Sequence, residues 1–216
     1  MNVFMGHFEV VLEELICKGV RIDTVIVENK PINFKVINIA RKHNIAFYIV
    51  DKYEEIEKIF SKYEKIDYCF VASFGIILKS KIIKKCNYII NFHPGDVFIC
   101  RGRHPLPSAI LYNYPEMGIT VHLIDDERID AGPILYRLLM PIDYNSSYKF
   151  NETRLLKALK CLASLVADDI KEKRIVVYKW DPSRSIYFKP LKKEVLQKII
   201  NSSRLMEIRG ENNNNN

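Results

Sequence analysis

The stretch NYIINFHPGD, residues 87–96, is a short apolar run that ends in polar groups. A run of this kind is typical of a strand buried on both faces of a parallel sheet. Successive side chains of a strand point to opposite faces, so we expect Asn91 and His93 on one side and Phe92 on the other. Ligands bind beyond the carboxyl ends of the strands in an open parallel sheet. The stretch therefore predicts such a sheet, with an amide and an imidazole facing its crevice.

This polar pair taken alone has two interpretations. Asn91 can satisfy the backbone of a loop while His93 is a buried, hydrogen-bonded histidine, or both can serve a site. An amide and an imidazole joined by a carboxylate can move an acyl group through a negatively charged tetrahedral intermediate. Asp130, in the segment ERIDAGPI, is a candidate for that carboxylate.

The residues before this strand alternate between short apolar runs and amphipathic stretches. Gly19 is placed to end a helix, and Pro31 suits a first helical position. We expect strands over 2–5, 23–29, 46–50 and 67–73, with helices over 8–19, 31–44 and 52–63 between them. This alternation predicts an α/β fold, a Rossmann-like, mostly parallel twisted sheet with helices on both faces.

The pattern changes after residue 100. We expect a short helix over 103–113, strands over 118–125 and 132–142, and a long amphipathic helix over 151–173. The segments IVVYKW and SIYFKPL and the amphipathic EVLQKIINSSRLMEI follow, and the chain then reads ENNNNN. We therefore expect a main domain of residues 1–173, a short C-terminal extension of 174–203, and a disordered Asn-rich tail of 204–216.

Composition narrows the class of protein. The 216 residues are 48% hydrophobic, which suffices for a full core. No apolar run approaches the length of a membrane span, and the N-terminus lacks the layout of a signal peptide, so we expect a cytoplasmic protein without a membrane partner. The five cysteines include no C-x-x-C pair, which disfavours disulfides and a metal site.

The net charge of +7 is spread over scattered lysines and not gathered in one block with aromatics. A solvated basic surface explains this pattern, and attraction for phosphorylated or carboxylated ligands is the functional alternative. The sequence has no dedicated nucleic-acid-binding module, so we expect small-molecule partners.

Residues 91–134 contain five further motifs in a fixed order. They are N-x-H-P at Asn91, R-G at Arg101, P-x-x-x-A-I from Pro105, G-x-T-x-H from Gly118 and D-x-G-x-I from Asp130. In order and spacing this segment resembles the core of the folate-dependent formyltransferases. One departure is the pair Phe98 and Ile99, where the family commonly has Leu-Pro, and it puts the conformation of that loop in doubt.

The resemblance implies a formyltransferase domain over residues 1–173 and a donor, 10-formyl-tetrahydrofolate. Asn91 would donate to the developing oxyanion, His93 would stabilise that charge and assist proton transfer, and Asp130 would hold the imidazole and help to deprotonate the attacking amine. Whether His93 or Asp130 is the base stays open. The loop SFGIIL resembles the folate side of the family site, and the implied folate residues are Phe74, Gly75, Ile76, Ile77, Leu78, Asp126 and Ile129.

The loop beside the catalytic trio is implied to bind the acceptor through Arg101, Arg103 and His104. Arg101, at the R-G position, is also suited to fixing the loop, while Arg103 and His104 are candidates for an acceptor phosphate. His122 is expected to be structural, with a supporting role near the folate as the alternative.

The acceptor is inferred by elimination and resemblance. The segment MGHFEVVLEE lacks the glycine- and serine-rich phosphate loop of enzymes that formylate glycinamide ribonucleotide. The methionyl-tRNA enzymes carry a C-terminal barrel for which little sequence remains after residue 173. Sugar formyltransferases resemble this layout, so a UDP- or dTDP-linked amino-deoxy sugar is favoured. Glycinamide ribonucleotide and methionyl-tRNA remain the alternative acceptors. A folate-binding regulatory module is the non-enzymatic alternative. The apolar C-terminal segment is compatible with a homodimer.

Overall fold

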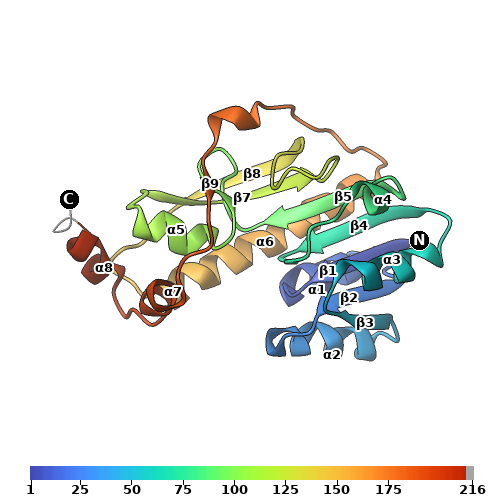
Figure 1. The fold of residues 1–216 in the computed structure, drawn as a ribbon, viewed down its shortest axis with the longest axis horizontal. Helices are drawn as coiled ribbons and strands as arrows, with labels where there is room; N and C mark the ends of the chain where they lie inside the picture. The colour runs from blue at the N-terminus through green and yellow to red at the C-terminus, as the bar shows by residue number, and fades with distance from the viewer. Residues whose placement is uncertain (213–216) are drawn as a thin grey trace.

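The computed structural model describes residues 1–212, with side chains through residue 208. Its main sheet has seven strands in the order β3-β2-β1-β4-β5-β7-β8 (Figure 1). Their bounds are β1 Asn2–Gly6, β2 Thr24–Glu28, β3 Ala46–Val50, β4 Ile66–Ala72, β5 Cys86–His93, β7 Glu116–Leu123 and β8 Ile134–Pro141. Strands β1 to β5 run parallel, while β7 is antiparallel to both of its neighbours, β5 and β8. The expected mostly parallel sheet is confirmed.

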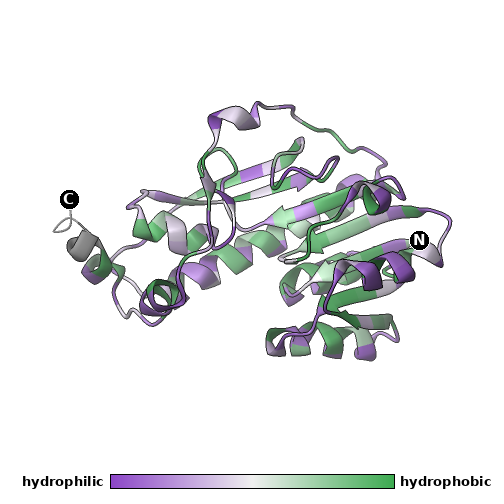
Figure 2. Cartoon of the chain, in the orientation of Figure 1, coloured by the Kyte–Doolittle hydropathy of each residue, from purple (hydrophilic) through white to green (hydrophobic). Residues whose placement is uncertain are grey.

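Helices cover both faces of the sheet (Figure 1). Helices α1 (Glu9–Cys17), α2 (Phe34–Lys42) and α6 (Tyr148–Lys171) pack on one face and share a single buried core with it. Helices α3 (Tyr53–Ser61) and α4 (Ser80–Ile83) enclose a second core on the other face. The strands are mostly hydrophobic, with hydrophilic stretches in β7 and β8, while the outer surfaces of the helices are largely hydrophilic (Figure 2). Burial on both faces is the reason the inner strands β1 and β2 read as continuous apolar runs, whereas the edge strands β3 and β8 are largely half-exposed.

The segment between β5 and β7 returns the chain across the carboxyl end of β5. It contains the short strand β6 (Arg101–Gly102) and helix α5 (Pro105–Leu111). Pro105 occupies the first helical position, where its missing N–H leaves no hydrogen bond unmade. This segment places the residues from 94 to 104 directly beside Asn91 and His93.

The C-terminal extension folds back over this segment. A 3-10 turn η2 (Pro182–Arg184) precedes strand β9 (Tyr187–Phe188), which pairs in parallel with β6, and helix α7 (Lys193–Ile200) follows. Tyr178 makes a separate antiparallel bridge to Ile134 of β8. The extension is therefore bound to the main domain at two places far apart in the sequence.

The expectation of a disordered tail from residue 204 is wrong for its first part. Leu205–Asn212 forms helix α8, in which Leu205 is fully buried and Ile208 is 6% exposed. These apolar side chains join the core that α1, α5 and α6 share, which orders the segment despite the polar residues that follow. Residues 213–216, the remainder of the expected tail, lie outside the described residues.

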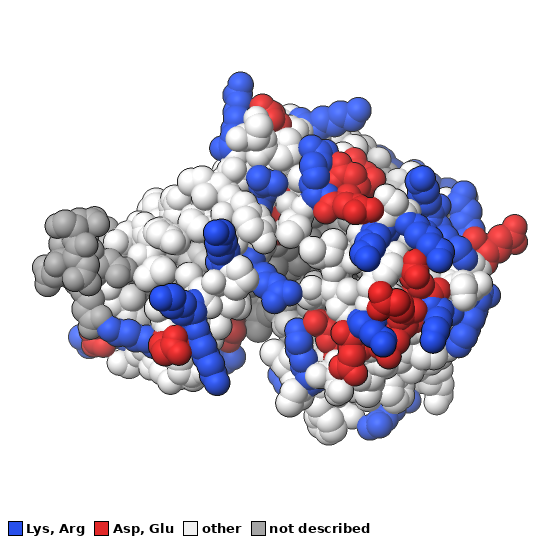
Figure 3. Space-filling view, viewed as in Figure 1, with Lys and Arg blue, Asp and Glu red and all other residues white. Residues whose placement is uncertain are grey.

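Along residues 1–212, no helix combines the length and the hydrophobicity that a membrane crossing requires. Lysine and arginine side chains are distributed over the visible face, with acidic side chains among them and a wide uncharged surface on its left half (Figure 3). This distribution matches the scattered lysines of the sequence.

Candidate active site

A cleft of about 580 Å³ opens at the carboxyl ends of β1, β2, β4 and β5. The space-filling surface is hollowed between its two halves, where the ends of β4 and β5 lie in Figure 1 (Figure 3). Asn91 and His93 reach the cleft from the end of β5, and Asp130 reaches it from the loop that joins β7 to β8. Phe92 is fully buried in the core, as the alternation of the strand predicts. The three predicted catalytic residues are thus brought together.

Asn91 is tied to two neighbours through its amide nitrogen. Nδ2 lies 3.2 Å from Oδ1 of Asp130 and 3.0 Å from Nε2 of His122. His122 is the residue paired with Asn91 across the antiparallel strands β5 and β7. Asn91 is only 9% exposed, and these two contacts set the orientation of its amide in this structure.

Asp130 is surrounded by polar groups from several segments. The amide of Gly102 donates to Oδ2 at 2.9 Å, His93 Nδ1 lies 3.5 Å from Oδ2, and His122 Nε2 lies 3.4 Å from Oδ1. Burial opposes ionisation of the carboxyl, but the two histidines and the Gly102 amide outweigh it and lower the pKa of Asp130. Asp130 is therefore a carboxylate at neutral pH.

His93 is enclosed between a carboxylate and a carbonyl. Its Nε2 lies 3.1 Å from the carbonyl oxygen of Cys100, and its Nδ1 faces Asp130. Burial lowers the pKa of His93, and the nearby Asp130 carboxylate partly opposes that effect. Both ring nitrogens thus face acceptors, while burial favours the neutral ring. Such a histidine can gain and lose a proton as charge develops beside it.

The loop from Pro94 to His104 has Phe98 and Ile99 where a Leu-Pro pair was expected, and contacts between side chains hold it in place. The guanidinium of Arg137 donates to both carboxylate oxygens of Asp96 at 2.8 and 2.7 Å, and it also lies 4.6 Å over the ring of Phe98. Trp180 packs against Phe98 with ring centroids 4.9 Å apart and donates to the carbonyl of Gly132. Where the family commonly has Leu-Pro, this aromatic contact fixes the loop.

A model of the formyl transferase family matches residues 14–164, which is most of the chain. The chain belongs to the formyl transferase family. Asn91, His93 and Asp130, the residues that the resemblance implies are catalytic, line one cleft.

Known proteins similar to this chain differ in their sequence identity to it and in the share of each chain that the match covers. A methionyl-tRNA formyltransferase from a Wolbachia strain of Drosophila simulans is 32% identical over 146 residues, covering 66% of this chain and 48% of that protein. The chain spans about half the length of the curated relatives it matches. An N-formyltransferase from Helicobacter canadensis, solved with folinic acid and dTDP-3-aminofucose, has a TM-score of 0.69 at 22% identity and covers 87% of this chain and 70% of its own. A 4-N formyltransferase from Francisella tularensis has a TM-score of 0.67 at 18% identity, with coverages of 92% and 87%. These structures share the fold.

All of the residues expected to contact the folate line the cleft. They come from the loop after β4 and from the loop after β7: Phe74, Gly75, Ile76, Ile77, Leu78, Asp126 and Ile129. The loop after β4 is tied to the end of β2, because Gly75 N donates to Oε2 of Glu28 at 3.0 Å. It is also tied to the loop after β5, because Arg103 donates to the carbonyl of Gly75 at 3.1 Å.

Of the three residues expected to bind the acceptor, two line the cleft and one does not. Arg103 and His104 line the cleft of the family site. Arg101 is not among the residues that line it. Its guanidinium donates to the carbonyl of Ile129 at 3.3 Å, so Arg101 fixes the loop that carries Asp130. Arg101 therefore suits the second role expected for it and not contact with the acceptor.

From the sequence, His122 is expected to be structural, and no role is assigned to His7, Glu28 or Lys30. His122 contacts both Asn91 and Asp130, and His7, Glu28 and Lys30 line the cleft on the side of β1 and β2. A signal for His122 was present in the alternation of GITVHLI, which puts it on the same face as Thr120. Thr120 is fully buried and donates to the carbonyl of Gly95, so this face of β7 points at the loop from Pro94 to His104.

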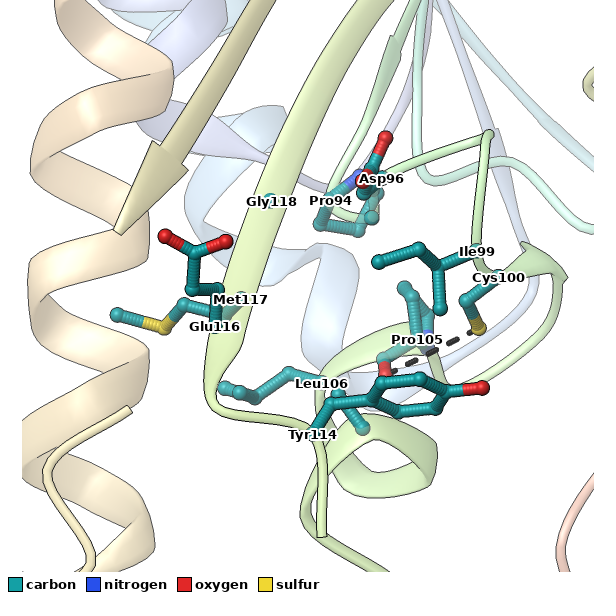
Figure 4. A pocket seen from close by; sticks show the side chains of 12 residues that line it. Pro94, Asp96, Ile99, Cys100, Pro105, Leu106, Tyr114, Glu116, Met117 and Gly118 are labelled. Carbon is teal, nitrogen blue, oxygen red and sulfur yellow. Dashed lines mark hydrogen bonds between the residues drawn. The ribbon is translucent and has the colours of Figure 1, made fainter. Parts of the chain in front are cut away.

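A small cavity of about 10 Å³ lies between the loop from Pro94 to His104, helix α5 and the start of β7 (Figure 4). Figure 4 shows Pro94, Asp96 and Cys100 of the loop above Leu106 and Tyr114, with Cys100 directed at the carbonyl of Pro105. The cavity has room for about one water molecule. It is a packing void behind the loop and not the substrate site.

An open groove of about 640 Å³ adjoins the cleft. Tyr187 and Pro190 line both, so the two spaces share a wall. Aromatic rings dominate the groove: Tyr112 and Phe188 stack with centroids 4.9 Å apart, and Tyr112 is 54% exposed. The groove also carries the basic side chains of Lys189 and Lys192. Its other lining residues are Leu111, Tyr112, Tyr114, Ile186, Tyr187, Phe188, Pro190, Leu191 and Val195.

Proposed function

We propose that this chain transfers a formyl group from 10-formyl-tetrahydrofolate to the primary amine of a nucleotide-linked amino-deoxy sugar. The observation that carries the proposal is the buried cluster of Asn91, His93 and Asp130 at the end of β5, with Asp130 ionised. Amide, imidazole and carboxylate are the groups required to stabilise an oxyanion and to move a proton beside it.

The reaction assigns one task to each residue. The neutral amine attacks the formyl carbon, a carbon–nitrogen bond forms, and the carbonyl electrons move to the formyl oxygen. Asn91 and His93 stabilise the resulting oxyanion, while Asp130 accepts a proton from the attacking nitrogen. Collapse of the intermediate breaks the bond between the formyl carbon and N10 of the folate, and N10 takes up a proton.

The cleft suits a folate. Its volume of about 580 Å³ lies in the range of small-molecule sites, and apolar side chains of Ile76, Leu78 and Ile124 line it beside backbone groups of the loop after β4. A flat pteridine needs such an apolar slot with polar groups at its edge. The residues that would hold it are those of the loops after β4 and β7.

The acceptor assignment is supported by the groove. Its exposed aromatic rings offer a face on which a nucleobase can stack, and Lys189 and Lys192 offer charge to a diphosphate. Because the groove and the cleft share Tyr187 and Pro190, a single extended ligand can occupy both. The similar fold from Helicobacter canadensis, solved with a dTDP-amino sugar, supports the same class of acceptor.

Methionyl-tRNA is the second candidate acceptor, because the curated relatives are methionyl-tRNA formyltransferases. A stacked terminal base and a phosphate would find the same aromatic and basic groups in the groove. The two candidates differ in size, and a direct assay separates them.

The deciding experiment offers 10-formyl-tetrahydrofolate with a panel of acceptors: UDP- and dTDP-amino sugars, glycinamide ribonucleotide and methionyl-tRNA. We expect transfer to an amino-sugar nucleotide. Asn91→Ala should reduce turnover by roughly a hundred- to a thousandfold, as expected for loss of one oxyanion donor. Asn87→Ala, an exposed change in the same strand, is the matched control. Transfer only to methionyl-tRNA or glycinamide ribonucleotide would refute the sugar assignment, and folate binding without any turnover would refute the enzyme.

A further inference from the structure

Chemistry fixes which end of the Asn91 amide points inward. Asp130 is a carboxylate and can only accept hydrogen bonds, so the amide end that faces it at 3.2 Å is the NH2 group. The same nitrogen lies 3.0 Å from Nε2 of His122. Both hydrogens of the amide are therefore directed at protein acceptors.

The tautomer of His122 follows from its other ring nitrogen. Nδ1 lies 2.8 Å from the carbonyl oxygen of Leu123, which can only accept, so the ring carries its proton on Nδ1. Nε2 is then an acceptor and takes the hydrogen bond from Asn91. His122 is 1% exposed, so no solvent competes for this bond.

The consequence is an apparent conflict with the proposed chemistry. With the NH2 group turned inward, the amide end left for the substrate is Oδ1, and no described residue donates a hydrogen bond to it. An amide oxygen repels an oxyanion, whereas the NH2 group stabilises one. Asn91 must turn its amide over before it can assist formyl transfer.

We propose that His122 is the positioning residue that controls this turn. A proton on Nε2 converts that nitrogen from an acceptor into a donor. Its single hydrogen then lies between the inward-turned Oδ1 of Asn91, at 3.0 Å, and Oδ1 of Asp130, at 3.4 Å, and offsets the repulsion between these two acceptors. The NH2 group is thereby released toward the formyl oxygen. The inference rests on the proposed oxyanion role of Asn91.

The acceptor can supply the proton. An aliphatic amine is an ammonium ion at neutral pH and must lose a proton before it attacks. Asp130 can receive that proton and pass it to Nε2 of His122, which is within 3.4 Å. In the complete reaction the ammonium nitrogen loses two protons, of which one ends on N10 of the folate and the other in solvent. Deprotonating the acceptor thus prepares the oxyanion site in the same step.

The groups that face His122 are few. Among the described residues the charged or titratable ones are Asp130, at 3.4 Å, and His93, whose ring centroid lies 6.4 Å away. The proton on His122 must therefore be followed on the nitrogens of His122 itself.

The test uses nitrogen NMR on the full chain without ligands, so it does not depend on the acceptor. At neutral pH we expect His122 to carry its proton on Nδ1 and to show a scalar coupling across the hydrogen bond from the Asn91 side-chain nitrogen to Nε2. On acidification that coupling should vanish together with protonation of Nε2. A proton on Nε2 at neutral pH, or a coupling that survives the titration of His122, would overturn the proposal.

Kinetics give a second readout with the acceptor that the panel identifies. His122→Phe can neither accept nor donate and should lower kcat by about a hundredfold or more while leaving the Kd for 5-formyl-tetrahydrofolate unchanged. His122→Gln can do both and should recover part of that loss. Equal kcat for the two variants, or a parallel loss of folate binding, would indicate a merely structural histidine. Failure of every acceptor would refute the proposed function, while the NMR result would still decide the role of His122.

Discussion

Gly102 and Phe188 pair in parallel across strands β6 and β9, and the amide of the same Gly102 donates to Asp130 at 2.9 Å. The C-terminal extension therefore holds the backbone group that fixes the carboxylate of Asp130. The extension also holds His104, because the amide of Leu191 donates to its Nδ1 at 3.2 Å. The extension is thus part of the site and not an appendage to it.

Gly102→Ala tests this relationship. Gly102 has a φ of +103°, and an added Cβ would lie 2.6 Å from the carbonyl oxygen of Phe188, so β6 and β9 must separate. We expect kcat to fall by about tenfold or more, with a loss of stability of about 1–3 kcal/mol from backbone strain. Gly19→Ala is the matched control, because its φ is +78° and no atom lies within 4 Å of the added Cβ. Gly19→Ala should cost stability and leave kcat unchanged, and equal kcat for both variants would contradict the link.

Asp130→Asn separates charge from shape at the centre of the site. The amide keeps the volume of the carboxyl but cannot take a proton from the attacking amine, and its NH2 group would face the Asn91 amide nitrogen 3.2 Å away or the donors on the other side. We expect turnover to fall by about a hundred- to ten thousandfold, measured as kcat under saturating donor. Asp51→Asn, an exposed carboxylate, should have no effect. Turnover within a few fold of the parent would remove Asp130 from the proton-transfer path.

Much of the fold follows from the sequence because burial and period act together in it. The strands from β1 to β5 are short, apolar on both faces and separated by helices with a buried stripe, and these features survive in any tertiary context. The grouping of Asn91, His93 and Asp130 could also be predicted from the sequence, because the order and spacing of the motifs between them resemble those of one family site.

The parts that escaped prediction depend on contacts between distant segments. β6 and β9 are two residues long, which is too short for any alternation to indicate a partner. Helix α8 is ordered by Leu205 and Ile208 on a distant core, whereas the asparagines beside them suggest disorder. The role of His122 depends on a tautomer that the Leu123 carbonyl sets, and no local pattern contains that information.

Stability should fall as the solution becomes mildly acidic. Burial lowers the pKa of His7, His93 and His104 below the ordinary value of 6.5. Below that pH the unfolded chain binds protons that the folded chain does not, so the free energy of unfolding falls as the pH drops below about 6.5. Each such histidine adds at most about 1.4 kcal/mol per pH unit to that slope. Above this range the three histidines leave stability unchanged.

Urea denaturation at intervals from pH 8 to pH 5 measures this slope. His7→Gln should make the slope shallower, since it removes one half-buried titrating group, whereas Asn87→Gln, at an exposed position without a titrating group, should leave it unchanged. The lowered pKa of Asp130 acts in a separate window, because its contribution is lost only as the pH falls below about 3.8. A stability that rises between pH 6.5 and pH 5 would contradict the burial of these histidines as neutral groups.

Leu205→Ala tests whether the chain is ordered beyond residue 204. Leu205 is fully buried, and α8 packs against α5, the helix that follows His104. Removing its side chain should lower the free energy of unfolding by about 2–5 kcal/mol, as expected for a cavity in a core. The neighbouring Met206 is 48% exposed, so Met206→Ala should change the same quantity by less than about 1 kcal/mol. Both variants should keep the parental kcat in the folded fraction, because α8 lies beyond α5, away from the end of β5 (Figure 1). Equal, small effects of the two substitutions in urea denaturation would mean that α8 does not pack on the core in solution.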